Sequence, residues 1–81
     1  VVAVGPGVTR VKPGDRVAGA FMPAWTEGPV DEAKARSALG GGAPGVAAEQ
    51  VVLDASGLVH VPAHLSDEEA ATLPCAAVTA W

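Results

Sequence analysis

Basic charge and long apolar runs are both scarce in this sequence. Five Lys and Arg residues stand against nine Asp and Glu residues, which gives a formal net charge of -4. The basic residues are spread along the chain and form no stripe that would release counterions from phosphates, so we expect no nucleic acid and no anionic membrane surface as partner. No stretch approaches the roughly 18 apolar residues of a membrane span, and the first residues lack a signal-peptide pattern.

Cysteine and aromatic residues are equally rare. Aromatics make up 4% of the chain, and Cys75 is its one cysteine. A single cysteine forms no internal disulfide, which is typical of a reducing compartment and predicts a cytoplasmic protein. The chain has 81 residues, of which 49% are hydrophobic and 17% charged, a globular composition with room for one small domain.

Both ends of the sequence resemble interruptions of a longer chain. It starts without Met in the β-branched run Val1–Val4 and stops at Trp81 inside an apolar helical pattern that has no C-cap glycine. We therefore expect a fragment of a longer protein, which folds poorly without its missing parts.

Short apolar segments separated by tight turns predict a β-structure for the first twenty residues. The expected strands are Val1–Val4, Val8–Lys12 and Asp15–Gly19. Glycine and proline stand in Gly5–Gly7 and Lys12–Asp15, and the second of these fits a type II turn. Because parallel pairing needs crossovers of a dozen or more residues, we predict an antiparallel barrel or sandwich.

The remainder of the chain reads as a long loop, a hairpin and a helical end. Residues 21–48 form the loop, with one or two helical turns at Asp31–Arg36. Glu49–Asp54 and Leu58–Val61 are expected to pair as a hairpin. A capping box at Ser66–Glu69 starts a helix at Asp67, and Pro74 suits the first turn of a second helix.

Two residues of the expected second helix are candidates for a site. Cys75 follows Pro74, where backbone amides at a helix start would lower the pKa of a thiol for thiolate chemistry or metal ligation. The favoured alternative is a small buried hydrophobe, because neither histidine stands at a ligand spacing to Cys75. Thr79 lies on the same helical face, and its hydroxyl donates either to a ligand or back to its own helix.

Other residues are weaker candidates. Trp25 in the long loop is a candidate for lining a substrate cleft, and His60 and His64 are expected to face solvent. The run Gly40–Gly42 is interpreted as a flexible hinge rather than a phosphate cradle, because no lysine-serine pair follows it.

Three segments together resemble the medium-chain dehydrogenase/reductase superfamily. They are V-V-A-V-G-P-G-V-T-R-V-K-P-G-D-R-V (Val1–Val17), A-E-Q-V-V-L (Ala48–Leu53) and L-S-D-E-E-A-A-T-L-P-C-A-A-V-T-A-W (Leu65–Trp81). More narrowly, they are similar to its NAD(P)-dependent alcohol dehydrogenase and quinone oxidoreductase-like branch. The resemblance implies a mainly β fold with C-terminal helices. Residues 1–65 would form the later part of a GroES-like antiparallel β-barrel, and residues 66–81 a helical connection to a Rossmann domain that is missing here.

The same resemblance implies an enzyme. The whole protein would transfer hydride between NAD or NADP, held mainly by the missing domain, and an alcohol, carbonyl or quinone/enone substrate, whereas the fragment alone would be inactive. A homodimer of the whole protein is a candidate assembly. Thr79 matches a threonine that packs near the nicotinamide ring, and Cys75 would line the same pocket.

Zinc is not expected from the resemblance. Zinc-containing members carry a four-cysteine lobe between the strands matched here by G-D-R-V and A-E-Q-V, and residues 21–48 contain no cysteine. Cys75 matches the third ligand of a catalytic zinc, whose other ligands would precede Val1, and the branch with L-P-C-A-A-V-T-A-W generally lacks them. Two alternatives stay open: a zinc-dependent alcohol dehydrogenase, and a stand-alone β-barrel interaction module without catalysis.

Overall fold

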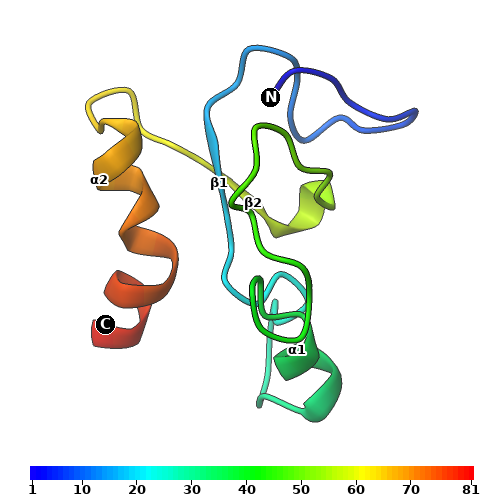
Figure 1. The fold of residues 1–81 in the computed structure, drawn as a ribbon, viewed down its shortest axis with the longest axis vertical. Coiled ribbons are helices and arrows are strands. Elements are labelled where there is room, and N and C mark those ends of the chain that lie inside the picture. Colours follow the sequence, from blue (N-terminus) through cyan, green and yellow to red (C-terminus); the bar gives the residue numbers. More distant parts are fainter.

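The computed structural model describes all residues from 1 to 81, and a two-stranded antiparallel sheet forms its centre (Figure 1). Strand β1 spans Val17–Gly19 and strand β2 spans Leu58–His60. Their register places Ala18 opposite Val59. The antiparallel arrangement predicted from the sequence is therefore present, although these two strands do not close a barrel.

Three of the five predicted strands do not form. Val1–Val4, Val8–Lys12 and Glu49–Asp54 carry no strand. The predicted hairpin is also wrong, because β2 pairs with β1, about forty residues away, and not with the segment that precedes it. The physical reason is that a β-branched run becomes a strand only where the edge of another strand is available to it.

The connection before β2 shows why the hairpin fails. Residues Ala55–Gly57 form the 3-10 helix η1, and the Asp54 carboxylate accepts hydrogen bonds from the backbone N–H and the hydroxyl of Ser56, at 2.8 and 2.7 Å. This capped turn is a stable local structure that a hairpin through the same three residues would have to break. The Gly57 carbonyl then accepts from the N–H of Ala20 at 2.8 Å, which extends the ladder with β1.

The tight turn between the first segments is as predicted. At Lys12–Asp15 the N–H of Asp15 donates to the Lys12 carbonyl at 3.1 Å, and Gly14 has a φ of 93°. A positive φ at the third turn position is what a type II turn needs and what glycine permits. The predicted turn is confirmed even though its flanking strands are not formed.

The long loop contains the predicted helical turns. Helix α1 spans Glu32–Arg36, and the Asp31 side chain caps it by accepting from the N–H of Lys34 at 2.8 Å. The run Gly40–Gly42 is folded into a close-packed turn: a Cβ atom at Gly42 would lie 2.3 Å from the carbonyl oxygen of Arg36. Glycine is therefore required there by space.

The C-terminal residues form one nearly continuous helical segment that starts as predicted. Helix α2 spans Asp67–Ala71 and begins with the complete Ser66–Glu69 capping box. After Thr72, the chain continues as the π-helix η2, Leu73–Ala77, and as helix α3, Val78–Ala80. Pro74 stands in the first turn of η2, the place in a helical element that the sequence predicted for it. No helix combines the length and apolarity needed to cross a membrane.

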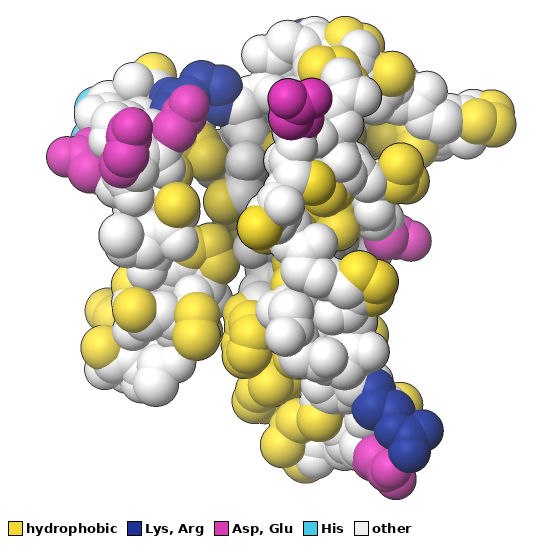
Figure 2. Space-filling model, in the orientation of Figure 1, with side chains coloured by type: hydrophobic (Ala, Val, Ile, Leu, Met, Phe, Trp, Pro, Cys, Tyr) yellow, Lys and Arg dark blue, Asp and Glu magenta, His cyan; other side chains and the backbone are white.

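The core of the molecule is small. The buried residues are Val11, Ala38, Gly57, Leu58 and Ala70. Most other large hydrophobic side chains are at least partly exposed, and Figure 2 shows them scattered over the visible face and along a groove beside the C-terminal arm. Each buried residue therefore accounts for a large part of the packing.

Candidate functional site

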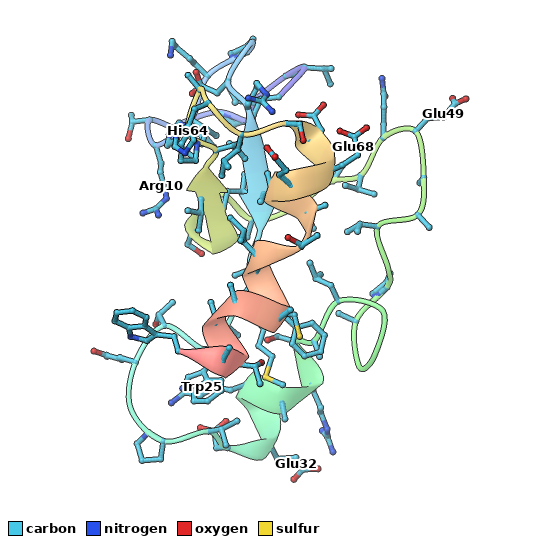
Figure 3. All side chains as sticks on the ribbon, turned by 90° about the vertical axis from the view of Figure 1, so that its left-hand side faces the viewer. Arg10, Trp25, Glu32, Glu49, His64 and Glu68 are labelled. Carbon is cyan, nitrogen blue, oxygen red and sulfur yellow. The ribbon has the colours of Figure 1, made fainter.

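A cleft lies where the loop after β1 faces the C-terminal helical segment. Its volume is about 290 Å³, and eight residues line it. The loop contributes Ala20, Phe21, Met22 and Trp25, and the helical segment contributes Pro74, Cys75, Val78 and Thr79. In Figure 3, Trp25 lies at the end of the molecule where the last helical turns face this loop. The cleft brings together the three site residues predicted from the sequence, Trp25, Cys75 and Thr79.

The tryptophan side of the cleft is held by hydrogen bonds from inside the loop. The indole Nε1–H of Trp25 donates to the Gly28 carbonyl at 2.8 Å. The Lys34 ammonium donates to the carbonyls of Glu27 and Pro29, both at 2.8 Å, on either side of that glycine. An ammonium group bonded to two carbonyls restrains the loop, so the indole has a fixed anchor.

Helix α1 is tied to the same loop by a serine. The Ser37 hydroxyl accepts from the N–H of Ala24 at 3.2 Å and donates to the Lys34 carbonyl at 2.6 Å. In addition, the N–H of Leu39 donates to the Phe21 carbonyl at 2.9 Å. These contacts make residues 21–29 an ordered wall rather than a free loop.

The helical side of the cleft is positioned by an ion pair with the sheet. The guanidinium of Arg16, just before β1, lies 2.5 Å from the Asp67 carboxylate and donates to the Leu65 carbonyl at 2.9 Å. Both groups are exposed, so the pair contributes little to stability, but its two anchor points orient the start of α2 relative to β1.

The structure decides between the alternatives that the sequence left open for Cys75 and Thr79. Cys75 is exposed, so the favoured interpretation as a buried hydrophobe is wrong. The helical segment packs by one face only, and Cys75 lies on its cleft side. The Thr79 hydroxyl donates to the Cys75 carbonyl at 2.7 Å, which is the helix-internal alternative. The Thr79 hydroxyl oxygen retains lone pairs that can accept a hydrogen bond from a ligand.

The other predicted candidates lie away from the cleft. His60 Nε2 lies 3.2 Å from the Arg10 carbonyl, and Nδ1 lies 3.9 Å from the Asp15 carboxylate. Both histidines are exposed, as predicted. No group of three or more His, Cys, Asp or Glu residues is placed to hold a metal ion, and no His, Asp or Glu residue lines the cleft beside Cys75.

Sequence reasoning missed Phe21, Met22 and Val78 as lining residues. Phe21 and Met22 belong to an apolar run directly after β1. That run in the sequence could have identified them as lining residues. A second cavity of about 230 Å³ lies between the sheet and the helical segment, and it shares Ala20, Pro74 and Val78 with the cleft. The two spaces therefore adjoin along an apolar surface.

The two carboxyl groups with a lowered pKa, those of Asp15 and Asp54, lie outside the cleft. Hydrogen bonds from the Lys12 side chain and backbone lower the pKa of Asp15 below its ordinary value, and those from Ser56 lower the pKa of Asp54. Both bonds favour the ionised carboxylate. These groups support turns and do not take part in the site.

The lowered pKa of Asp15 predicts an acid-dependent contribution to stability. Because the folded pKa lies below that of the unfolded chain, the stabilisation is present above about pH 4 and is lost as the pH falls through the folded pKa. We expect Asp15→Asn to lower the melting temperature of the whole protein at pH 7, and this difference from the wild type to shrink below pH 4. A difference that stays constant between pH 7 and pH 3 would contradict the assignment. His64→Asn, at an exposed residue that forms no ion pair, is the control.

The fold and the cleft can now be compared with known proteins. The chain belongs to the alcohol dehydrogenase GroES-like domain family, whose sequence model matches residues 1–63. Among curated proteins it is similar to the zinc-type alcohol dehydrogenase-like protein C1773.06c of Schizosaccharomyces pombe, with 46% identity over 78 residues. The match covers 96% of this chain but 22% of that relative. No solved structure matches the chain.

The comparisons confirm part of the sequence prediction. The alcohol dehydrogenase family and its GroES-like domain are confirmed. The quinone oxidoreductase-like branch stays a prediction. The chain spans about a fifth of the relative's length, 22%.

Proposed function

We propose that the whole protein containing this chain is an NAD(P)-dependent oxidoreductase that transfers hydride between a nicotinamide and an alcohol, carbonyl or quinone/enone substrate. The observation that carries the proposal is the meeting of Trp25, Cys75 and Thr79 at one apolar cleft, in a chain of the alcohol dehydrogenase GroES-like family. Small-molecule sites in proteins are typically such apolar clefts with a few polar groups.

The residues of the cleft fit the ring end of a nicotinamide cofactor. The Thr79 oxygen can accept from a carboxamide N–H, and Trp25 offers a flat apolar surface. The phosphates do not fit here, because no charged side chain lines the cleft. We propose that they are bound by residues outside positions 1–81.

The chain's own contribution is positioning and exclusion of water. A bound nicotinamide supplies or accepts two electrons and one hydrogen as hydride, while a proton is gained or lost at the substrate oxygen. Phe21, Met22 and Val78 would shield the reacting atoms from water, and the fixed wall would hold the substrate in one orientation. The protein group that exchanges the substrate proton lies, in this proposal, outside these residues or is water.

We propose further that this reaction needs no zinc held by Cys75. A second candidate, zinc-dependent alcohol oxidation, is favoured by the printed name of the yeast relative, which is called zinc-type. Cys75 is exposed at a cleft that no His, Asp or Glu residue lines, and it belongs to no group of three or more ligating side chains. A zinc there would require ligands from elsewhere in the whole protein, because catalytic sites use three protein ligands.

The hydride transfer is tested with the whole protein and reduced nicotinamide deuterated at the transferring position. We expect absorbance loss from NADH or NADPH on addition of an aldehyde, ketone or quinone, and, with an aldehyde or ketone, deuterium on the carbinol carbon of the product. If neither cofactor is consumed with any of these substrates, the proposal fails, and the stand-alone interaction module becomes the better explanation.

The zinc question is tested with Cys75→Ala and the conservative control Cys75→Ser. We expect no stoichiometric zinc in the purified whole protein and a kcat/KM for Cys75→Ala within about threefold of the wild type, since a wall residue contributes only packing. One zinc per chain that is lost on Cys75→Ala, together with a large fall in kcat, would overturn the zinc-free proposal and favour the second candidate.

The remaining expectations are part of the same proposal. We propose a cytoplasmic protein whose partner is a small-molecule substrate rather than nucleic acid or membrane, and a homodimer as its candidate assembly. The supporting observations are the acidic net charge and the single cysteine. Size-exclusion chromatography with light scattering measures the assembly directly.

A further inference from the structure

We infer that Lys34 is a positioning residue of the proposed reaction: its ammonium group binds two carbonyls of the wall and thereby holds Trp25 at the cleft. The effect on turnover rests on the proposed function, whereas the effect on Trp25 is independent of any reaction. In Figure 3, Trp25 and helix α1, which carries Lys34, lie at the same end of the molecule. The partners of the ammonium group, its burial and the backbone that presents the carbonyls all support this role.

The ammonium group of Lys34 is bound to the wall rather than to the nearest carboxylate. Its Nζ donates to the carbonyls of Glu27 and Pro29, both at 2.8 Å. The carboxylate of Asp31, three residues earlier, lies 4.0 Å from Nζ and instead accepts from the backbone N–H of Lys34. An ionised acceptor ordinarily competes well for an ammonium group. The contact with two neutral carbonyls therefore shows that α1 and the wall are oriented for it.

Lys12 provides a contrast within the same chain. It also stands three residues from an aspartate, and its Nζ lies 2.6 Å from the Asp15 carboxylate. The Lys12 side chain is 79% exposed, whereas that of Lys34 is 23% exposed. Ordering a long side chain against the protein costs conformational entropy, and the two hydrogen bonds to the wall offset that cost for Lys34. Lys34 is therefore the lysine that joins separate parts of the fold.

Gly28 lies between the two carbonyls that bind the ammonium group. Its φ of 67° is in the left-handed region that glycine adopts readily. The Gly28 carbonyl accepts from the indole Nε1–H of Trp25 at 2.8 Å, while the carbonyls of Glu27 and Pro29 accept from Lys34. The indole and the ammonium group thus bind three consecutive carbonyls of one short segment. A movement of that segment moves the anchor of the indole with it.

Loss of the ammonium group would release the Trp25 end of the wall without unfolding the protein. The hydroxyl of Ser37 would still accept from the N–H of Ala24. Glu27 and Pro29 are exposed, so water can bond their carbonyls in place of the lysine. The fold then loses little stability, but the indole loses its fixed position. Misplacing a group that orients the reactants lowers the rate of the chemical step.

The activity test compares Lys34→Met with Lys34→Arg in the whole protein. Lys34→Met keeps an apolar stem without donors, and we expect kcat to fall about tenfold or more while KM changes less than about threefold. Lys34→Arg keeps the charge and the N–H donors and should retain at least about a third of kcat. Lys12→Met, the matched control, should stay within about twofold of the wild type. Equal losses in Lys34→Met and Lys34→Arg would assign the effect to packing and overturn the inference.

Time-resolved fluorescence anisotropy tests the same role without cofactor or substrate. The signal of Trp25 is the difference between each protein and its version with Trp25→Phe. We expect the amplitude of nanosecond motion of Trp25 to rise about twofold or more in Lys34→Met and to stay at the wild-type value in Lys12→Met. The melting temperature of Lys34→Met should stay within about 4 °C of the wild type, so the added motion is local.

The two measurements separate this inference from the proposed function. If no nicotinamide is consumed but Trp25 becomes mobile in Lys34→Met, the hydride proposal fails and the hold of Lys34 on Trp25 is retained. If nicotinamide is consumed and Lys34→Met keeps the wild-type kcat, or leaves the motion of Trp25 unchanged, the inference is overturned and the hydride proposal is retained.

Discussion

Leu58→Ala is expected to lower the free energy of unfolding of the whole protein by about 2–3 kcal/mol, within the usual range for a buried leucine. Leu58 is buried at the start of β2. It lines two spaces of about 280 and 140 Å³. Truncation to alanine enlarges spaces that are already present, so the cavity term adds to the lost burial.

Urea denaturation, followed by far-ultraviolet circular dichroism, measures this loss. Val59→Ala is the matched control, because Val59 is the next residue of the same strand and its side chain is exposed. We expect the control to cost less than about 1 kcal/mol. Equal losses for the two variants would show that Leu58 does not have the packing role assigned to it.

Gly57→Ala is expected to cost about 1–3 kcal/mol and also to lower kcat/KM of the whole protein, because it overpacks a contact between η1 and the loop that lines the cleft. A Cβ atom at Gly57 would lie 2.4 Å from the Cβ atom of Pro23 and 3.3 Å from its Cα atom. The proline ring cannot move far without its backbone. The segment between Met22 and Trp25 must therefore shift, and the wall shifts with it.

The Gly57 variant is assayed in the whole protein for melting temperature and for kcat/KM with the aldehyde, ketone or quinone that it reduces. Gly5→Ala serves as control, since a Cβ atom there meets nothing within 4 Å. We expect the control to match the wild type in both measurements. A Gly57 variant with wild-type melting temperature and an unchanged kcat/KM would contradict the close contact between Pro23 and η1.

The elements that were predicted correctly depend on residues close together in the sequence. The Ser66–Glu69 capping box starts α2, and the Lys12–Asp15 turn has its glycine at the position with positive φ. The short helix at Asp31–Arg36 also forms where it was expected. Each of these structures satisfies its hydrogen bonds within three or four residues, so the local sequence contains the information needed.

The strand predictions failed where the outcome depended on distant residues. Val1–Val4 and Glu49–Asp54 have the composition of strands but no strand edge beside them. Leu58–Val61 was correctly placed as extended, but its partner was misassigned. A strand's hydrogen bonds are made with another segment of chain, and periodicity within one segment does not identify that segment.

The candidate site likewise has features that the sequence indicated and features that only the tertiary structure decided. The sequence and its family resemblance were enough to single out Trp25, Cys75 and Thr79 and to identify the alcohol dehydrogenase GroES-like family. Their meeting in one cleft, the participation of Phe21 and Met22, and the exposure of Cys75 were decided only by the tertiary structure. The reason is that about fifty residues separate the wall from the helical segment. Their distance in space depends on the β1–β2 pairing and the packing of the whole chain, which no local pattern contains.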